Sequence, residues 1–176
     1  MSKVKIFKVS FSKLVIKLFF LIVLIFLLFT IYFMSIHCLK GFLNNDLRLG
    51  LIGVMFLIFS IYLTNYFGTV IKLFIQYFNN ERNRIIILDF EKTHMSIKDK
   101  TKGLTILSSD NLSVIEHNIS SKDSKNLTSD YNFLKLIDKS ENSFIVTSLV
   151  MNSSEILNLF PNVKTIIKFN EINFIS

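Results

Sequence analysis

The chain has 176 residues, of which 51% are hydrophobic, and a formal net charge of +7 at pH 7. The charge is unevenly placed: residues 1–80 carry eight Lys and Arg against the single Asp46, whereas residues 81–176 carry twelve residues of each sign. The C-terminal half therefore lacks the net positive field that displaces counterions from phosphates, which argues against a nucleic-acid polymer as a partner.

The first 17 residues are basic and contain no acidic residue. Lysines near anionic lipid headgroups each contribute about 1 kcal/mol to membrane binding. We therefore expect residues 1–17 to form a basic N-terminal tail in the headgroup region.

Two stretches without a charged residue follow, Leu18–Ile36 and Leu49–Ile71. Each is long enough to cross a bilayer as a helix, which takes about 20 apolar residues. Because the connection between them is short, we expect a transmembrane helical hairpin over residues 18–79. The first apolar run is longer than that of a signal peptide, and the chain has no Ala for an A-x-A cleavage site.

Positive flanks remain on the cytoplasmic side of a membrane. The basic tail precedes the first span, and Lys72, Arg82 and Arg84 follow the second. This pattern predicts a multi-pass membrane protein with both termini in the cytoplasm.

From residue 80 onward the hydrophobic period changes from helical to two, which predicts a cytosolic β domain over residues 80–176. A short helix is expected from Ser153 or Ser154 to Phe160, ended by Pro161. Short strands separated by turns favour a small antiparallel β-barrel with one short helix. Six strands are expected at Ile85–Phe90, His94–Lys98, Gly103–Leu107, Leu112–Ile119, Tyr131–Ile137 and Ser143–Thr147. The segments Val163–Phe169 and Ile172–Ile175 are expected to supply one or two more.

The segment YNFLKLIDKSENSFIVTSLVMNSSEILNLF, with Asp110 before LSVIEHNI upstream of it, resembles bacterial pleckstrin-homology-like (PH-like) domains that follow a two-helix membrane hairpin. The resemblance implies a PH-like barrel that binds a protein or a lipid. The chain departs from the family after Ser154, where a short helix and strand-like residues replace the long helix that closes one end of a PH barrel.

A second resemblance rests on the order of parts alone. The two-helix, β-barrel effectors of CBASS antiphage systems have this size and organisation, and their barrel binds a cyclic nucleotide while their helices assemble and damage the membrane. It remains an analogy of architecture.

The turn IKDKTKG holds Lys98, Lys100 and Lys102, at a place where PH domains often contact lipid headgroups. The functional interpretation is an anion or phospholipid contact, and the alternative is a solvated hairpin turn interrupted by Asp99.

Gly50, Gly53 and Ser60 fall roughly on one face of the second span. Small residues let membrane helices approach closely. Packing within the hairpin and packing between protomers are both open.

His37, His94 and His117 lie in separate segments, and the single Cys38 adjoins only the first of them. A zinc site needs three or four ligands at suitable spacing, so we predict no metal. No nucleophile elbow, P-loop or dinucleotide fingerprint occurs, and we predict neither an enzyme nor a cofactor.

The leading hypothesis is a non-enzymatic protein of a bacterial inner membrane whose cytosolic barrel is a membrane-tethered interaction module for protein or lipid. Its expected partners are the lipid bilayer and either a protein partner or a second copy of the chain, bound through the transmembrane hairpin. The alternative is a CBASS-like effector that senses a cyclic nucleotide and oligomerises through its helices.

Overall fold

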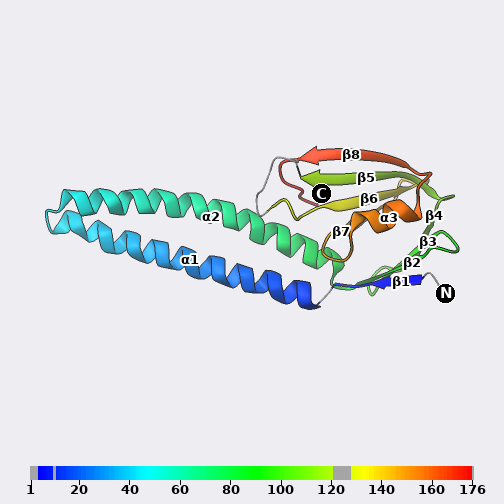
Figure 1. Cartoon of the computed structure of the whole chain (residues 1–176), viewed down its shortest axis with the longest axis horizontal. Helices are drawn as coiled ribbons and strands as arrows, with labels where there is room; N and C mark the ends of the chain where they lie inside the picture. Colours follow the sequence, from blue (N-terminus) through cyan, green and yellow to red (C-terminus); the bar gives the residue numbers. More distant parts are fainter. Residues whose placement is uncertain (1–3, 10, 121–127, 176) are drawn as a thin grey trace. The chain divides into compact units, whose positions relative to one another are not determined.

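A computed structural model of the chain describes residues 4–9, 11–120 and 128–175. The described elements run in the order β1, α1, α2, β2 to β7, α3 and β8 (Figure 1). The chain forms two compact units, a helical unit of Leu14–Lys72 and a unit of Met1–Lys13 with Leu73–Ser176 that contains the strands. We refer to these as the hairpin unit and the sheet unit.

Strand β1 (Val4–Phe7) shows that the sheet unit begins before the helices. It pairs antiparallel with β2 (Arg84–Asp89), with Val4 opposite Asp89 and Phe7 opposite Ile86. The expectation of a tail over residues 1–17 is therefore wrong for these four residues, while Lys3 lies outside the described residues. The two long helices are inserted between the first two strands, so the sheet unit does not simply follow the hairpin.

The strands form two four-stranded sheets rather than the single barrel expected from the sequence. One sheet is antiparallel in the order β1-β2-β3-β4, with β3 at His94–Asp99 and β4 at Gly103–Ser108. The other has the order β7-β6-β5-β8, and its edge strand β8 runs parallel to β5. Its strands are β5 (Leu112–Ser120), β6 (Phe133–Asp138), β7 (Ser143–Thr147) and β8 (Lys164–Asn170).

The core of the sheet unit takes alternate side chains from both sheets, as the two-residue period of a strand requires. Leu88, Met95 and Leu136 are fully buried in this core cluster. Helix α3 (Ser153–Leu159) adds Ile156 to this core. Its N-cap is Asn152 rather than the expected Ser153 or Ser154, because the Asn152 side chain accepts a hydrogen bond from the Ser154 backbone N–H.

The last turns of α2 (Leu47–Glu81) belong to the sheet unit and take part in its packing. The Tyr77 side chain is fully buried, its ring meets those of Tyr131 and Phe133 edge-on at centroid distances of 5.2 and 6.3 Å, and its hydroxyl donates to the Asn173 carbonyl. Asn173 lies in the segment Ile172–Ile175, which is not a strand, contrary to the expectation. This segment instead covers the end of α2.

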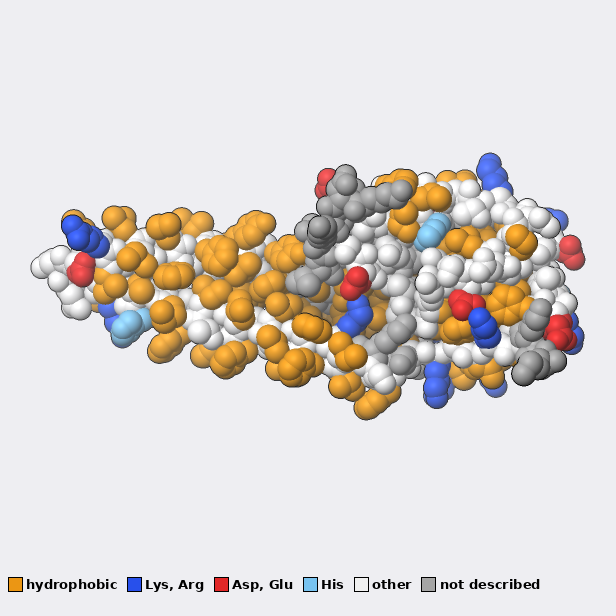
Figure 2. All heavy atoms as spheres, in the orientation of Figure 1, with side chains coloured by type: hydrophobic (Ala, Val, Ile, Leu, Met, Phe, Trp, Pro, Cys, Tyr) orange, Lys and Arg blue, Asp and Glu red, His pale blue; other side chains and the backbone are white. Residues whose placement is uncertain are grey.

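Helix α1 (Phe11–Leu43) from Leu14 onward and the remainder of α2 form the hairpin unit, joined by residues 44–46 with Asn45 at a positive φ of 58°. Both helices are long and apolar enough to cross a membrane. Their large side chains are largely exposed: Phe26 and Met55 are each 71% accessible, and hydrophobic side chains dominate this part of the surface in Figure 2. A core helix of a water-soluble protein would bury such side chains.

Small residues lie where α1 and α2 approach each other. A Cβ at Gly53 would lie 2.6 Å from the Leu39 backbone nitrogen, and one at Gly50 would lie 2.6 Å from the Phe42 ring. Ser35 donates to the Gly53 carbonyl across the helix pair, while Ser60 is buried and donates to Leu57 in its own helix. Gly50 and Gly53 thus face α1, and a role of these residues or Ser60 in contacts between protomers stays a prediction.

Candidate functional site

A basic pocket of about 400 Å³ lies in the sheet unit where β1, β2 and β3 meet. The register explains it: Phe7 is opposite Ile86, so the chain continues with Lys8 beside Ile85, and Ile85 is opposite Lys98. Residues opposite each other on neighbouring strands share a face of the sheet. The pocket is lined by Lys8, Val9, Arg82, Asn83, Arg84, Ile85, Lys98 and Lys100.

One cation of this pocket is already paired. Arg84 Nε donates to Asp99 Oδ2 at 2.9 Å, and Arg84 Nη1 donates to Asn80 Oδ1 and to the Ile145 carbonyl. The guanidinium and further hydrogen bonds from Thr101 hold the pKa of the Asp99 carboxyl well below its usual value. Arg84 is therefore a structural cation whose charge is largely offset.

Four other cations of the pocket are exposed and have no carboxylate partner among the described residues: Lys8, Arg82, Lys98 and Lys100. Like charges that converge without a counterion raise the local potential and attract an anion from solution. The basic pocket can accordingly hold a phosphate or another compact anion by charge and by ammonium or guanidinium hydrogen bonds.

Two of the three lysines singled out from the sequence, Lys98 and Lys100, line this pocket, and Lys102 does not. Lys102 is exposed in the turn before Gly103, where its backbone N–H points to Asp99 Oδ1 at 3.4 Å. That Lys98, Lys100 or Lys102 contacts an anion stays a prediction. The sequence predicts Lys8 as part of the N-terminal tail and gives no local signal that it lies in this pocket.

The end of α2 binds the edge strand β7 through polar side chains. Glu81 is fully buried, and its Oε1 accepts the Thr147 backbone N–H at 2.8 Å, while Asn80 Nδ2 and Arg84 Nη1 donate to the Ile145 carbonyl. Burial raises the pKa of the Glu81 carboxyl to about 7. The three side chains thus form hydrogen bonds with backbone groups of the edge strand β7 that would otherwise have no partner in the sheet.

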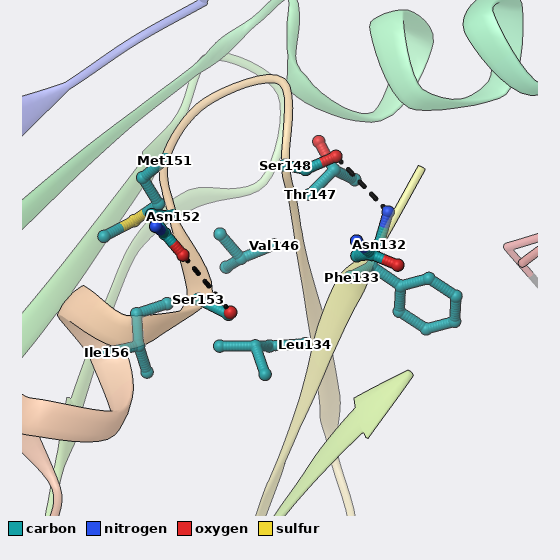
Figure 3. Close-up of a pocket in the computed structure, with 10 residues that line it drawn as sticks. All are labelled: Asn132, Phe133, Leu134, Val146, Thr147, Ser148, Met151, Asn152, Ser153 and Ile156. Carbon is teal, nitrogen blue, oxygen red and sulfur yellow. Dashed lines mark hydrogen bonds between the residues drawn. The ribbon is translucent and has the colours of Figure 1, made fainter. Parts of the chain in front are cut away.

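A second cavity of about 260 Å³ lies beside α3 and is uncharged (Figure 3). Its apolar side includes Leu134, Val146 and Ile156. Among its polar groups, Ser148 Oγ accepts from the Asn132 N–H and donates to the Asp130 carbonyl, whereas Thr147 Oγ1 is buried without a hydrogen-bond partner among the described residues. This cavity offers no charge to an anionic ligand.

No group of three or more His, Cys, Asp or Glu suited to a metal ion occurs among the residues that the structure describes. His94 lies on β3 and His117 on β5, in different sheets, while His37 is in α1. The absence of enzymatic activity stays a prediction.

Residues 6–159 match the PH domain family. The match begins within β1, continues through both long helices and ends with α3, so it spans the inserted hairpin together with most of the sheet unit. No curated protein and no solved structure matches the chain. The matched segment covers most of the 176 residues, and the chain therefore belongs to the PH domain family.

Proposed function

We propose that the chain is a non-enzymatic protein of a bacterial inner membrane, anchored by α1 and α2 with both termini in the cytoplasm, whose sheet unit binds phosphate-bearing anions at the bilayer surface. The basic pocket is the observation that supports this binding, because four exposed cations without a carboxylate partner among the described residues converge there.

Chain connectivity favours an anion that belongs to the membrane. Arg82 follows the last residue of α2 directly, and Lys8 lies ten residues before the apolar run that starts at Leu18. PH domains commonly bind lipids or proteins, and an anionic phospholipid offers both the phosphate and the location.

The experiment uses the full chain in detergent micelles that contain equal amounts of phosphatidylglycerol and phosphatidylcholine. Native mass spectrometry counts the lipids retained by the protein, and a separate titration with inorganic phosphate measures binding of the free anion. Preferential retention of phosphatidylglycerol supports a lipid headgroup, and binding of phosphate without lipid preference supports a free anion.

The discriminating variant is the double change Lys98→Glu and Lys100→Glu, which replaces two positive charges of the pocket with negative ones. The matched control is Lys102→Glu, an exposed lysine two residues away that does not line the pocket. Loss of binding in the double variant with retention in the control supports the proposal. Equal retention in all three proteins contradicts it.

Thermal unfolding of the full chain in detergent, with and without a cyclic dinucleotide, tests the alternative prediction of a nucleotide sensor. Since a ligand at 100 times its Kd stabilises its protein by about 2.7 kcal/mol, an unchanged unfolding temperature argues against that alternative.

A further inference from the structure

Strand β8 forms a free edge of the second sheet (Figure 1). It pairs with β5 on one side, and no other strand of the described residues pairs with its opposite side. The match to the PH domain family ends at residue 159, so β8 is an addition to the matched segment. An edge strand with unpaired backbone N–H and C=O groups is a template for a strand of another chain.

The other edges of the two sheets are less suited to such pairing. β1 has only four residues, and Asn80, Glu81 and Arg84 bind the backbone of β7. β4 begins at Gly103, which has a φ of 87°, and its core-facing Leu107 is already buried. β8 has seven residues without Pro or Gly, and three of them are β-branched, as strands favour.

The core face of the sheet is left uncovered at β8. Ile115 on β5 is fully buried in the core cluster and lies opposite Thr165 in the parallel register. Because alternate residues of a strand share a face, Thr165, Ile167 and Phe169 all lie on the core face. Ile167 and Phe169 are nevertheless 54% and 58% exposed. Apolar side chains left exposed on the core face favour a further strand that continues the sheet.

We propose that β8 pairs antiparallel with β8 of a second copy of the chain, about a twofold axis at Ile167, so that the two sheets continue into one. Twofold symmetry is the commonest arrangement of homo-oligomers, and it uses the same surface on both copies. On the core face, Ile167 then lies opposite Ile167 of the second copy, and Thr165 lies opposite Phe169. Such cross-strand pairs of apolar and β-branched side chains stabilise a ladder.

The lysines of β8 select this register. With the axis at Ile167, Lys164 and Lys168 both lie opposite uncharged residues. An axis at Ile166 would place Lys164 opposite Lys168, and an axis at Lys168 would place that lysine opposite its own copy. Like charges directly opposite each other are destabilising. Lys168 is also paired with Glu116 of its own chain, at 2.6 Å, which offsets its charge at the edge.

This interface is separate from the basic pocket, which lies where β1, β2 and β3 meet. The inference therefore goes beyond the proposed anion binding. Loss of phosphate binding with pairing retained would contradict only the proposed function, and the reverse result would contradict only the inference.

The test places single cysteines on β8 of the full chain with Cys38→Ser, in phosphatidylcholine vesicles treated with a mild oxidant. Directly opposite residues of an antiparallel ladder have Cα atoms about 4.5–5.5 Å apart, within the range that a disulfide spans. Ile167→Cys should therefore form a disulfide-linked dimer. Thr165→Cys is the matched control, because in this register it lies about 13 Å along the strand from its own copy.

A mixture of two variants tests the register. Thr165→Cys and Phe169→Cys, with tags of different mass, should each form no disulfide dimer alone and should form the mixed dimer when they are reconstituted together. Dimers of Thr165→Cys or Lys168→Cys alone, at the yield of Ile167→Cys, overturn the inference because they indicate random collision or another register. Absence of either the Ile167→Cys dimer or the mixed dimer also overturns it.

A charge variant tests the pairing without a cysteine at the axis. Ile167→Asp places two negative charges opposite each other, and Ile106→Asp is the matched control, since Ile106 is 51% exposed on the edge strand β4. In the mixture, Ile167→Asp should lower the yield of the mixed dimer about tenfold or more, whereas Ile106→Asp should leave it unchanged. Equal yields in both contradict pairing through β8. Thermal unfolding without oxidant verifies the fold of each variant, and if Ile167→Asp does not fold, the cysteine series decides.

Discussion

The buried Glu81 carboxyl is a residue whose ionisation is expected to change the stability of the fold near neutral pH. Its pKa in the folded protein is raised to about 7 from 4.5, chiefly by burial against β7. The native state therefore binds the proton more tightly than the unfolded chain between these two pH values. The stability contributed by protonated Glu81 is complete below pH 4.5 and is lost as the pH rises through 7.

We predict that Glu81→Gln removes this pH dependence, because an amide keeps an oxygen for the Thr147 N–H and has no charge to desolvate. Thermal unfolding of the full chain in detergent, measured from pH 5 to pH 8, compares the two proteins. The variant should gain stability relative to the native protein as the pH rises, by up to about 3 kcal/mol.

The difference between the two proteins is the informative quantity. Burial lowers the pKa of His117, and this group gives a slope of the opposite sign below pH 6.5, since there the unfolded chain binds more protons. That slope is common to both proteins and cancels. A constant difference in stability across the pH range would show that Glu81 is not neutral at the junction.

A second residue-scale prediction concerns Asp99, whose carboxylate offsets the charge of Arg84 at the basic pocket. Asp99→Asn should raise the affinity for phosphate about fivefold, as expected for one additional charge nearby at low ionic strength. Asp138→Asn is the matched control: Asp138 also accepts hydrogen bonds in a hairpin turn, and it does not line the pocket. An isothermal titration of phosphate into the three proteins decides, and unchanged affinity in Asp99→Asn contradicts an electrostatic role for the pocket.

At the scale of elements, the close approach of α1 and α2 depends on the missing side chain of Gly53. A Cβ there would meet backbone atoms of Leu39 and Cys38 within 2.9 Å, and backbone cannot rotate away as a side chain can. Gly68 has no atom within 4 Å of its Cβ position.

We predict that Gly53→Ala lowers the thermal stability of the hairpin in detergent, whereas Gly68→Ala leaves it unchanged or raises it by up to about 1 kcal/mol through helix propensity. Both substitutions add the same methyl group to the same helix, so the comparison isolates the contact. Equal changes in thermal stability in the two variants would show that α1 and α2 can move apart at Gly53 without loss of stability, and would contradict the prediction.

Several elements follow from local sequence because their signals are local. The strand at IIILDF is a short run of mainly β-branched apolar residues, and the strands of the β6–β7 hairpin flank a polar turn. The structure places these strands within two residues of the expected bounds. The turn Lys139–Asn142 is local in the same way: Asp138 Oδ1 accepts the Ser140 and Asn142 N–H groups.

Other features depend on partners far away in the chain, which local patterns do not encode. The pairing of β1 with β2 joins residues about 80 positions apart, although the alternation in KVKIF is itself a strand signal. The parallel pairing of β8 with β5 and the division into two sheets depend in the same way on long-range register. For the same reason the sequence predicts an anion contact at Lys98 and Lys100, which lie in one turn, and does not predict that Lys8 lies beside them.

At the scale of the whole molecule, the insertion of the helices between β1 and β2 bears on membrane topology. The two strands share a four-residue ladder, so the segments before α1 and after α2 must lie in one compartment if both helices span a bilayer. This requirement is independent of the lysine distribution and places both ends on one side of the membrane, while the positive flanks favour the cytoplasm as that side.

We predict that in intact cells Asn45, in the connection between α1 and α2, is accessible from outside, and that Ser140, in the turn between β6 and β7, is not. Both positions are exposed, and Cys38 is the single native cysteine, so Cys38→Ser gives a background for single cysteines at either position. A membrane-impermeant maleimide should label Asn45→Cys in intact cells and Ser140→Cys only after permeabilisation. In a two-span hairpin, the turn between the helices lies on one side of the bilayer and the segments before α1 and after α2 lie on the other. Labelling of both positions in intact cells, or of neither, would contradict a spanning hairpin. Labelling of Ser140→Cys alone would instead keep the hairpin and reverse its orientation, moving the basic pocket to the outer leaflet.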